Sequence, residues 1–388
     1  MDAKKFFTNK SVCTVPWHGF ELEPSGVVKN CIISTDDIGD IHKGDIQSIL
    51  HGEKNINLKQ QMLIDSKPSN CSGCHLQEKN RNDLVNISSR KYYLRELIDK
   101  NNLKFYDDSK NFSLTHVDLR WNNTCNQACV YCGPNLSSKW ATELKKFVRS
   151  DKTAREEVKK YIFDNVKNLK NVYLAGGEPL LMKDNLNFLK LLKEENPKCN
   201  IRVNTNLSKT DTGIYELLKT FENVHWILSV EAVEEEYNYI RYHGDWKIFE
   251  TNLKEIQTLK HKVSFNMLHF ILNYKSIFNC ITYLQNQGFN DNSFILGPLY
   301  TPLYYNCLNL PDKMLNEVLS ILIDKKQNAS GYLKNSYENL LTYYTTTEWK
   351  KNIKSFYYNM GRLDDRRKQE SRIIFKNLYQ ELDAHTLE

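Results

Sequence analysis

The sequence contains no long apolar run, few turn-forming residues and no strong excess of one charge. Its 388 residues include only 15 glycines and 9 prolines, and no repeat period indicates a solenoid or a low-complexity linker. No apolar run approaches the roughly 18 residues of a membrane-spanning helix, and the start, MDAKKFFTNKSVC, lacks the apolar region of a secretory signal. With 40% hydrophobic residues, the chain is expected to fold around an ordinary core, away from membranes, in a cytoplasm.

The charge balance argues against nucleic-acid binding as the main activity. The formal net charge is +6, from 53 Lys and Arg against 47 Asp and Glu, and these residues are dispersed along the chain. A nucleic-acid footprint would show a clustered basic stripe. We therefore interpret the small excess as a solvated surface and regard a nucleic-acid partner as unlikely.

Ten cysteines are the most informative feature of the composition. A reducing cytoplasm makes disulfides unlikely, so clustered cysteines indicate metal ligation or catalysis. Four lie in the first fifth of the chain, three lie within eight residues, and three are scattered, in the order Cys13, Cys31, Cys71 and Cys74; Cys125, Cys129 and Cys132; Cys199, Cys280 and Cys307.

From residue 113 onward, short β-rich apolar runs alternate with stretches of helical period. Strands are expected at 115–120, 171–175, 200–204, 225–231, 263–271 and 293–296. The spacing leaves room for a right-handed βα crossover between successive strands, which predicts an α/β fold with a parallel sheet and helices outside it. Six such units predict a partial (β/α)6 barrel with its active residues at the C-terminal ends of the strands.

The regions around this barrel differ in composition. Residues 1–84 are interpreted as a small cysteine-rich β-hairpin module. Its core is too small to be stable by itself, so we expect a bound metal to stabilise it. Residues 85–112 are expected to form a helical bridge, 113–310 the barrel and 311–388 a helical C-terminal tail. The charged run 363–368 in that tail is expected to face solvent.

The three clustered cysteines follow the first predicted barrel strand in the segment Asn123-Thr-Cys125-Asn-Gln-Ala-Cys129-Val-Tyr-Cys132. Three thiolates are one fewer than a closed zinc or iron-sulfur site uses. An iron left open to an outside ligand can bind and reduce a substrate. The alternative from the residues alone is an incomplete zinc site that borrows a distant histidine.

The spacing Cys125-x3-Cys129-x2-Cys132, with Tyr131 before the third cysteine, resembles the signature of the radical S-adenosylmethionine (SAM) superfamily. The next strand ends in Ala175-Gly-Gly-Glu-Pro179, which is similar to the glycine-rich methionine-binding motif of that superfamily. The resemblance implies that the three cysteines hold a catalytic [4Fe-4S] cluster whose fourth iron binds SAM. Glycines without Cβ atoms let the backbone approach such a ligand. Further cofactor contacts are implied for Tyr131, Gly176, Gly177, Glu178, Asn204, Asn206, Ser229, Glu231 and Arg241, with ordinary packing or satisfied polar groups as the alternative.

The four N-terminal cysteines could close one tetrahedral site, and their spacing alone favours zinc. The segments Cys13-Thr-Val-Pro-Trp17, Pro24-Ser-Gly-Val-Val-Lys-Asn-Cys31 and Cys71-x2-Cys74, followed by Glu78, Ser88 and Arg90, resemble the auxiliary-cluster segment of SPASM and twitch radical enzymes. The resemblance implies an auxiliary [4Fe-4S] cluster, with structural zinc as the alternative. Relatives often have a second cysteine beside the position of Cys31, where this chain has Asn30 and Ile32.

The resemblance implies an oxidoreductase that reductively cleaves SAM to a 5′-deoxyadenosyl radical, which removes hydrogen from a peptide or small-molecule substrate. A dehydrogenase or epimerase type of reaction and a one-electron donor such as flavodoxin or ferredoxin are implied as well. A non-catalytic SAM- and cluster-binding protein and an RNA-modifying enzyme are the alternatives. The Tyr- and Pro-rich segment 297–310 is expected to line the substrate pocket together with the cysteine module, through Tyr304 and Tyr305, with packing against the C-terminal helices as the alternative. Cys307 in the same segment is a candidate hydrogen donor to the substrate, with a buried small hydrophobic residue as the alternative.

Overall fold

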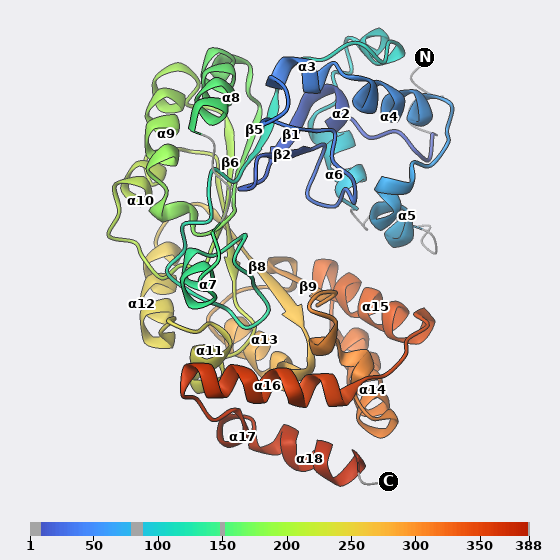
Figure 1. Ribbon diagram of the computed structural model, residues 1–388, viewed down its shortest axis with the longest axis vertical. Helices are drawn as coiled ribbons and strands as arrows, with labels where there is room; N and C mark the ends of the chain where they lie inside the picture. Colours follow the sequence, from blue (N-terminus) through green and yellow to red (C-terminus); the bar gives the residue numbers. More distant parts are fainter. Residues whose placement is uncertain (1–8, 79–87, 148–151, 387–388) are drawn as a thin grey trace. The chain divides into compact units, whose positions relative to one another are not determined.

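The computed structural model describes residues 9–78, 88–147 and 152–386 (Figure 1). The chain forms two compact units. The first comprises Met1–Cys125, Pro134–Thr205 and Lys209–Trp226, and the second comprises Asn126–Gly133, Asn206–Ser208 and Ile227–Glu388. Each unit is described by itself.

The first unit is built on a sheet in the order β3-β2-β1-β4-β5-β6, followed by the start of β7. Strands β1, β4, β5 and β6 pair in parallel, while β1, β2 and β3 pair antiparallel. The strand bounds are β1 Gly19–Leu22, β2 Val27–Lys29, β3 Gly39–Asp40, β4 His116–Leu119, β5 Asn171–Leu174, β6 Asn200–Thr205 and β7 Val224–Ser229.

The predicted N-terminal hairpin is confirmed and consists of β1 and β2. Its turn is closed by backbone hydrogen bonds from Gly26 to the carbonyl of Glu23 and from Glu23 to the carbonyl of Val27, both 2.9 Å. Gly26 has φ +90°, a conformation that glycine adopts without steric cost. The hairpin joins the rest of the unit because β1 lies beside β4 in parallel register.

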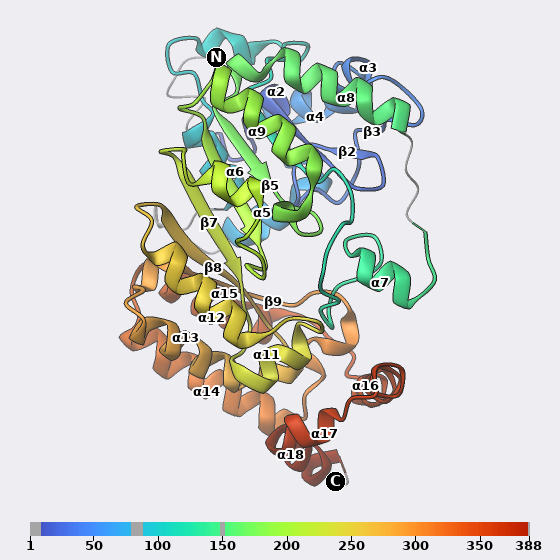
Figure 2. The ribbon, with the colours of Figure 1, turned by 90° about the vertical axis from the view of Figure 1, so that its left-hand side faces the viewer.

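Helices of the first unit cover its parallel strands and surround the N-terminal segment. Helix α9 buries Asn185, Phe188, Leu189 and Leu192, a spacing that places them on one helical face. Helices α8 and α9 lie on the same side of β5 (Figures 1 and 2). The bounds are α2 Val15–His18, α3 Ile46–Leu50, α4 Glu53–Leu63, α5 Ser72–Glu78, α6 Ser89–Glu96, α7 Ser138–Glu143, α8 Lys152–Asp164, α9 Lys183–Glu195 and α10 Gly213–Leu218, with 3-10 helices η1 Ser69–Cys71, η2 Leu103–Asp107, η3 Val166–Asn168 and η4 Pro179–Leu181.

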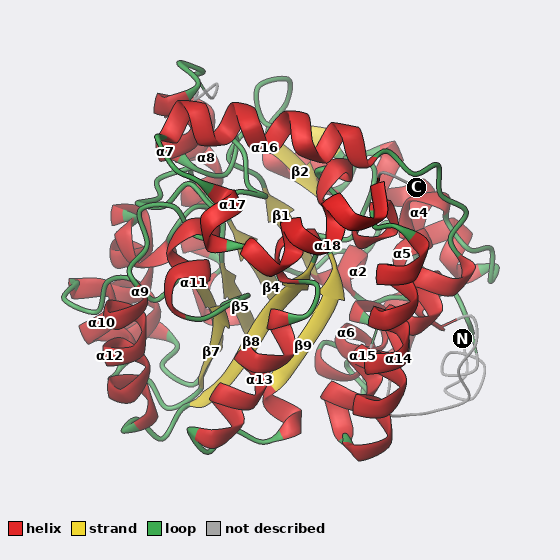
Figure 3. Cartoon of the chain, turned by 90° about the horizontal axis from the view of Figure 1, so that it is seen from below, coloured by secondary structure: helices red, strands yellow, loops and turns green. Residues whose placement is uncertain are grey.

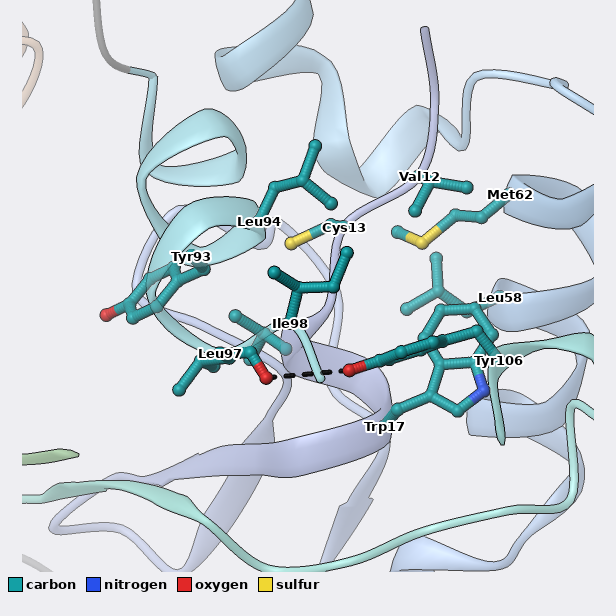
Figure 4. Packing of buried hydrophobic residues seen from close by; sticks show 11 residues of the cluster. Val12, Cys13, Trp17, Leu58, Met62, Tyr93, Leu94, Leu97, Ile98 and Tyr106 are labelled. Atoms are coloured by element: carbon teal, nitrogen blue, oxygen red, sulfur yellow. Dashed lines mark hydrogen bonds between the residues drawn. The ribbon is translucent and has the colours of Figure 1, made fainter. Parts of the chain in front are cut away.

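A hydrophobic cluster packs the N-terminal segment against the bridge helix α6. It brings Trp17 of α2, Leu58 and Met62 of α4, and Tyr93 of α6 together (Figure 4). Trp17 is fully buried and its ring meets that of Tyr106 edge to face at 6.0 Å. Cys13 lies in the same cluster, so the cysteine segment is anchored by apolar packing as well as by any bound metal.

The second unit contains the end of β7 and the parallel pair β8 Lys262–His269 and β9 Phe294–Pro298. Helix α15 lies alongside β9 (Figure 3). The helices of the second unit are α11 Glu234–Ile240, α12 Trp246–Gln257, α13 Ser276–Asn286, α14 Asp312–Asn328, α15 Gly331–Thr346, α16 Ile353–Arg367, α17 Ser371–Ile374 and α18 Lys376–Thr386, with 3-10 helices η5 Ile271–Asn273, η6 Asp291–Ser293, η7 Leu303–Tyr305 and η8 Cys307–Asn309.

The α/β fold with a parallel sheet is confirmed, and it is consistent with the predicted partial (β/α)6 barrel. The compact units cut across the predicted boundaries at 84/85 and 112/113, because β1 and β4 share a sheet. The predicted domain assignments stay predictions.

The expectation that 363–368 faces solvent is wrong for half of that run. Leu363 and Arg367 are buried. Asp364 accepts hydrogen bonds from the Tyr239 hydroxyl at 2.6 Å and from Ser371 at 2.6 Å. The guanidinium of Arg367 lies 4.3 Å from the centre of the Tyr242 ring. Asp364 and Arg367 face inward because they contact Tyr239 of α11 and Tyr242 just after it.

Candidate active site

In the first unit, the loop after β4 carries Cys125 and is held by short-range hydrogen bonds. The backbone nitrogen of Cys125 donates to the Ser138 hydroxyl at 3.1 Å, and that hydroxyl donates to the Cys125 carbonyl at 3.0 Å. Asn123 donates to the carbonyl of Pro134 at 2.8 Å. Cys125 is half-buried, so its thiol is positioned by a braced backbone at the end of a strand.

The glycine-rich turn after β5 docks directly on this loop. The backbone nitrogen of Glu178 donates to the carbonyl of Thr124 at 2.7 Å. Gly176 has φ +105°, and a Cβ on Gly177 would lie 2.1 Å from the Thr124 carbonyl oxygen. The carboxylate of Glu178 is buried and accepts from Thr205 at 2.6 Å and from the Leu180 nitrogen at 3.1 Å. The two motifs found in the sequence are therefore in contact, with Gly176 required by its positive φ and Gly177 by the close approach of the Thr124 backbone.

In the second unit, Cys129 and Cys132 lie in a short segment that is hydrogen-bonded to the end of α11 and to Tyr242 just after it. Ala128 donates to the Tyr242 carbonyl at 2.9 Å, and Val130 donates to the Ile240 carbonyl at 2.8 Å. Burial, with a smaller contribution from the nearby Cys129, raises the pKa of Cys132 to about 12. These thiols stay protonated at neutral pH unless a metal binds the thiolate form.

Arg241 is the centre of a buried polar group beside Cys129. Its guanidinium donates to both carboxylate oxygens of Glu231, at 2.7 and 2.8 Å, and to the Tyr131 hydroxyl at 2.7 Å. It lies 3.8 Å from the sulfur of Cys129. Burial raises the pKa of Cys129, and the charge of Arg241 opposes that shift. Three of the predicted cofactor residues, Tyr131, Glu231 and Arg241, thus form one hydrogen-bonded group.

The other predicted cofactor residues lie at strand ends. Asn206 donates to Asn126 at 3.1 Å and accepts from the Ser208 nitrogen at 2.9 Å, which fixes the loop after β6 within the second unit. Asn204 in β6 and Ser229 in β7 are both half-buried. Their cofactor roles stay predictions.

The four N-terminal cysteines surround one space in the first unit. Cys13 precedes α2, Cys31 follows β2, Cys71 ends η1 and Cys74 lies in α5. All four line one cavity together with Ser11, Ile33, Ser34, Met62, Ser89, Arg90 and Tyr93. Within the described ranges, no three His, Cys, Asp or Glu side chains are gathered closely enough to hold a single metal ion. The four thiols are thus spread around a space and do not converge on the position of one metal ion.

Burial dominates the chemistry of these four thiols. Burial, with a smaller contribution from the neighbouring Cys74, raises the pKa of Cys31 and of Cys71 to about 12. Cys13 has a raised pKa for the same reason, with Cys31 as its largest charged neighbour. Four mutually close thiols without a bound cation are costly to ionise, so this set favours binding of a positively charged metal centre.

A buried ion pair braces the cavity wall. Arg90 donates to Glu78 through Nε at 3.0 Å and through Nη2 at 2.5 Å, and to the carbonyl of Val12 at 2.8 Å. Ser88 also donates to Glu78. The residues that follow Cys74 in the resemblance are thus brought together with the backbone next to Cys13.

The predicted substrate residues are mostly buried in the second unit. Tyr305 is 1% exposed, its hydroxyl lies 3.4 Å from the Met360 sulfur, and its ring meets Phe356 of α16. Cys307 is fully buried near His269, and Tyr304 is half-buried. This placement favours the packing alternative for Tyr305 and Cys307, and substrate contact at these residues stays a prediction.

The structure reveals a set of polar residues that sequence reasoning missed. Glu21, Asp118, Tyr173 and Arg202 lie in register on β1, β4, β5 and β6 of the first unit. With Arg120 they form what we call the polar belt. The sequence signal that could have revealed the polar belt is the presence of polar residues at alternate positions of strands that were expected to be buried.

Comparison with known proteins agrees with the radical SAM motifs. Residues 120–295 match the family model described as Radical SAM superfamily, so this part of the chain carries a radical SAM domain. No curated protein matches the chain in sequence.

Among solved structures, the chain is similar to anSMEcpe with bound AdoMet at 19% identity and a TM-score of 0.41, covering 55% of this chain and 60% of that one. It is similar to Streptococcus suis SuiB bound to precursor peptide SuiA at 15% identity and a TM-score of 0.43, covering 87% and 76%. The chain thus spans about 60% of the length of anSMEcpe. Across the described residues, the helices are all too short or too polar to cross a membrane.

Proposed function

We propose that this chain is a radical SAM oxidoreductase with a catalytic [4Fe-4S] site at Cys125, Cys129 and Cys132 and an auxiliary [4Fe-4S] site at Cys13, Cys31, Cys71 and Cys74. The radical SAM domain at residues 120–295 supports the first assignment. The observation that carries the second is the convergence of four thiols, distant in sequence, on one buried cavity.

The donor sets fit these groups. Three cysteines in one loop leave one iron of a four-iron cluster open, and four cysteines around a volume match a cluster in which each thiolate binds a different iron. When bound, the catalytic cluster and SAM supply an electron and the 5′-deoxyadenosyl radical that removes a hydrogen atom from the substrate. The residues of this chain bind and orient the cofactors and the substrate, and they exclude water from the site.

Each described contact has a role in that arrangement. The Ser138 bridge holds the backbone of Cys125, and the Glu178 nitrogen holds the carbonyl of Thr124 beside the glycine-rich turn. Arg241 fixes Glu231 and Tyr131 and places a positive charge 3.8 Å from Cys129, which favours its thiolate form. In this proposal the glycine-rich turn receives the methionine end of SAM.

The substrate is proposed to be a peptide or a small molecule, and the electron donor a flavodoxin or ferredoxin. The auxiliary cluster would accept an electron from the substrate radical, so that the net reaction is an oxidation. A non-catalytic protein that binds SAM and clusters is the competing function.

Anaerobic reconstitution with iron and sulfide tests the proposal. We expect about eight irons and eight sulfides per chain, because two four-iron clusters are proposed. The triple change of Cys125, Cys129 and Cys132 to Ala should remove about half of the iron and abolish 5′-deoxyadenosine formation. Cys71→Ala should lower the auxiliary iron while leaving some cleavage of SAM.

Cys199→Ala is the control, because Cys199 is a buried cysteine that belongs to neither motif and does not line the four-cysteine cavity. It should keep all of the iron. A parent protein with about four irons and bound zinc would refute the auxiliary cluster. Full iron without any 5′-deoxyadenosine under reducing conditions would support the non-catalytic function.

A further inference from the structure

The polar belt lies on one face of the parallel sheet of the first unit. Glu21 is the register partner of Asp118, Asp118 of Tyr173, and Tyr173 of Arg202. Side chains alternate between the two faces of a strand, so the neighbouring residues Phe20, Val117, Val172 and Ile201 point to the other face, where all four are fully buried. The belt is therefore a continuous polar row across four adjacent strands.

The charges in this row are only partly paired. The Nε of Arg120 lies 2.8 Å from Glu21 and 3.0 Å from Asp118, and its Nη2 donates to the second Asp118 oxygen at 3.0 Å. Arg120 is thus the ion-pair partner of both Glu21 and Asp118. Across the part of the chain that the structure describes, no carboxylate lies within the 4.0 Å of an ion pair with Arg202.

Arg202 lies mainly against aromatic rings, and Asp118, the acid that also attracts its charge, is already ion-paired with Arg120. Its guanidinium carbon lies 4.9 Å from the centre of the Tyr92 ring and 5.1 Å from that of the Tyr173 ring. Its Nε is buried and has no hydrogen-bond partner among the residues that the structure describes. The residue as a whole is half-buried, as are both tyrosines, so part of the group remains open to an incoming molecule.

The surroundings connect Arg202 to both predicted cofactor sites within the same unit. The ring of Tyr92 lies 5.2 Å from that of Tyr93, and Tyr93 lines the four-cysteine cavity. At the other end of the belt, a Cβ on Gly176 would lie 3.1 Å from the Cβ of Arg120. Arg202 thus belongs to a polar wall that reaches from the auxiliary site to the glycine-rich turn.

A guanidinium that is partly desolvated and unpaired is unfavourable until an anion joins it. Aromatic rings stack on its flat face and leave its edge free, and that edge matches the two oxygens of a carboxylate. We propose that Arg202, between Tyr92 and Tyr173, binds a carboxylate group of the substrate. This inference rests on the proposed function and narrows its substrate to a molecule that carries a carboxylate.

Two sources could present that group, namely an acidic side chain or the carboxyl end of a chain or small acid. Three probes of nearly equal size separate them. N-acetylglutamate α-amide carries only a side-chain carboxylate, N-acetylglutamine carries only a terminal carboxylate, and N-acetylglutamine amide is neutral. Their binding to the reconstituted protein is measured by saturation-transfer NMR, which detects weak ligands without turnover.

We expect at least one anionic probe to bind to the parent protein and the neutral probe to give no signal. Arg202→Gln should weaken that binding by about tenfold or more, since a charge-assisted hydrogen bond is lost. Arg362→Gln is the matched control, because Arg362 also stacks on a tyrosine, Tyr358 at 5.5 Å, but is exposed on α16. It should bind the probe like the parent.

Arg202→Lys is a second variant for the case that Arg202→Gln fails to fold, because it keeps the positive charge. It should fold, as judged by circular dichroism, and bind the anionic probe more weakly than the parent because the planar fork is gone. Parent-like binding in Arg202→Lys or Arg202→Gln, equal binding of the neutral probe, or no anionic binding to the parent would each overturn the inference. Formation of 5′-deoxyadenosine is scored separately, so a protein that cleaves SAM without binding the probes refutes this inference alone.

Discussion

Replacing Gly177 with alanine tests whether the glycine-rich turn is packed against the cysteine loop. The new Cβ would lie 2.1 Å from the Thr124 carbonyl oxygen and 2.7 Å from its carbon, whereas real Cβ atoms are hardly ever found within 3.0 Å of another atom. Because the obstacle is backbone, it cannot rotate away as a side chain would. One of the two segments must move by close to an ångström.

The cost follows from what that movement disturbs. Overpacking of a filled site costs about 1–3 kcal/mol. The Thr124 carbonyl also accepts the 2.7 Å hydrogen bond from Glu178, and loss of a buried hydrogen bond costs about 1 kcal/mol more. Gly177→Ala should therefore lower the free energy of unfolding by about 2–4 kcal/mol and displace the adjacent Cys125.

Gly133→Ala is the matched control, because it follows the third cysteine of the same loop and a Cβ there would meet no atom of the described residues within 4 Å. Both changes restrict the unfolded chain equally, so their difference isolates the clash. Urea unfolding of the metal-free protein, followed by circular dichroism, gives the free energies, and iron content after reconstitution reports on Cys125. Equal unfolding of the two variants would refute the reasoning.

Three further predictions concern the second unit. Arg241→Gln leaves the carboxylate of Glu231, 1% exposed, without its partner, so the free energy of unfolding should fall by about 3–5 kcal/mol in urea; an unchanged midpoint would contradict this. Burial lowers the pKa of His269 from 6.5 to about 4, so the folded protein resists protonation, and stability should fall by up to roughly 3 kcal/mol as the pH drops from 6.5 to 4. A His269→Gln variant should show a shallower fall, and an equal slope would exclude His269 as the cause. Tyr305→Ala should cost about 3–5 kcal/mol through the cavity it leaves, while Tyr305→Phe should cost about 1; a negligible loss for Ala would show that the ring is not packed.

Local patterns predicted the strands well, because each is bounded by turn signals. The expected strand 171–175 is observed as Asn171–Leu174, and 200–204 as Asn200–Thr205. The expected strand 225–231 extends beyond the observed end at Ser229 because Val230 and Glu231 remain buried. Residues that follow a strand can be as buried as the strand itself, so the sequence pattern overestimates the length of the strand.

Pairings between distant segments could not be predicted in this way. The hairpin of β1 and β2 was evident from its turn, but nothing in its sequence indicates that β1 lies beside β4. For the same reason, the spacing of the cysteines indicated a set of four, while their convergence on one cavity depends on the packing of α2, α5 and α6. The apolar cluster around Trp17 and Tyr93 brings α2 and α6 together, and Cys71, just before α5, packs against it.

The polar belt shows what the strand pattern did contain. Strands of a parallel sheet that is covered on both faces are usually apolar throughout, yet β4 alternates, with Val117 and Leu119 between His116, Asp118 and Arg120. All five of these side chains are buried. Alternation in a buried parallel strand means that its second face is lined by polar groups and not by a packed apolar layer. Such a face needs either internal partners, as Arg120 provides for Asp118, or an external one, as the unpaired Arg202 implies.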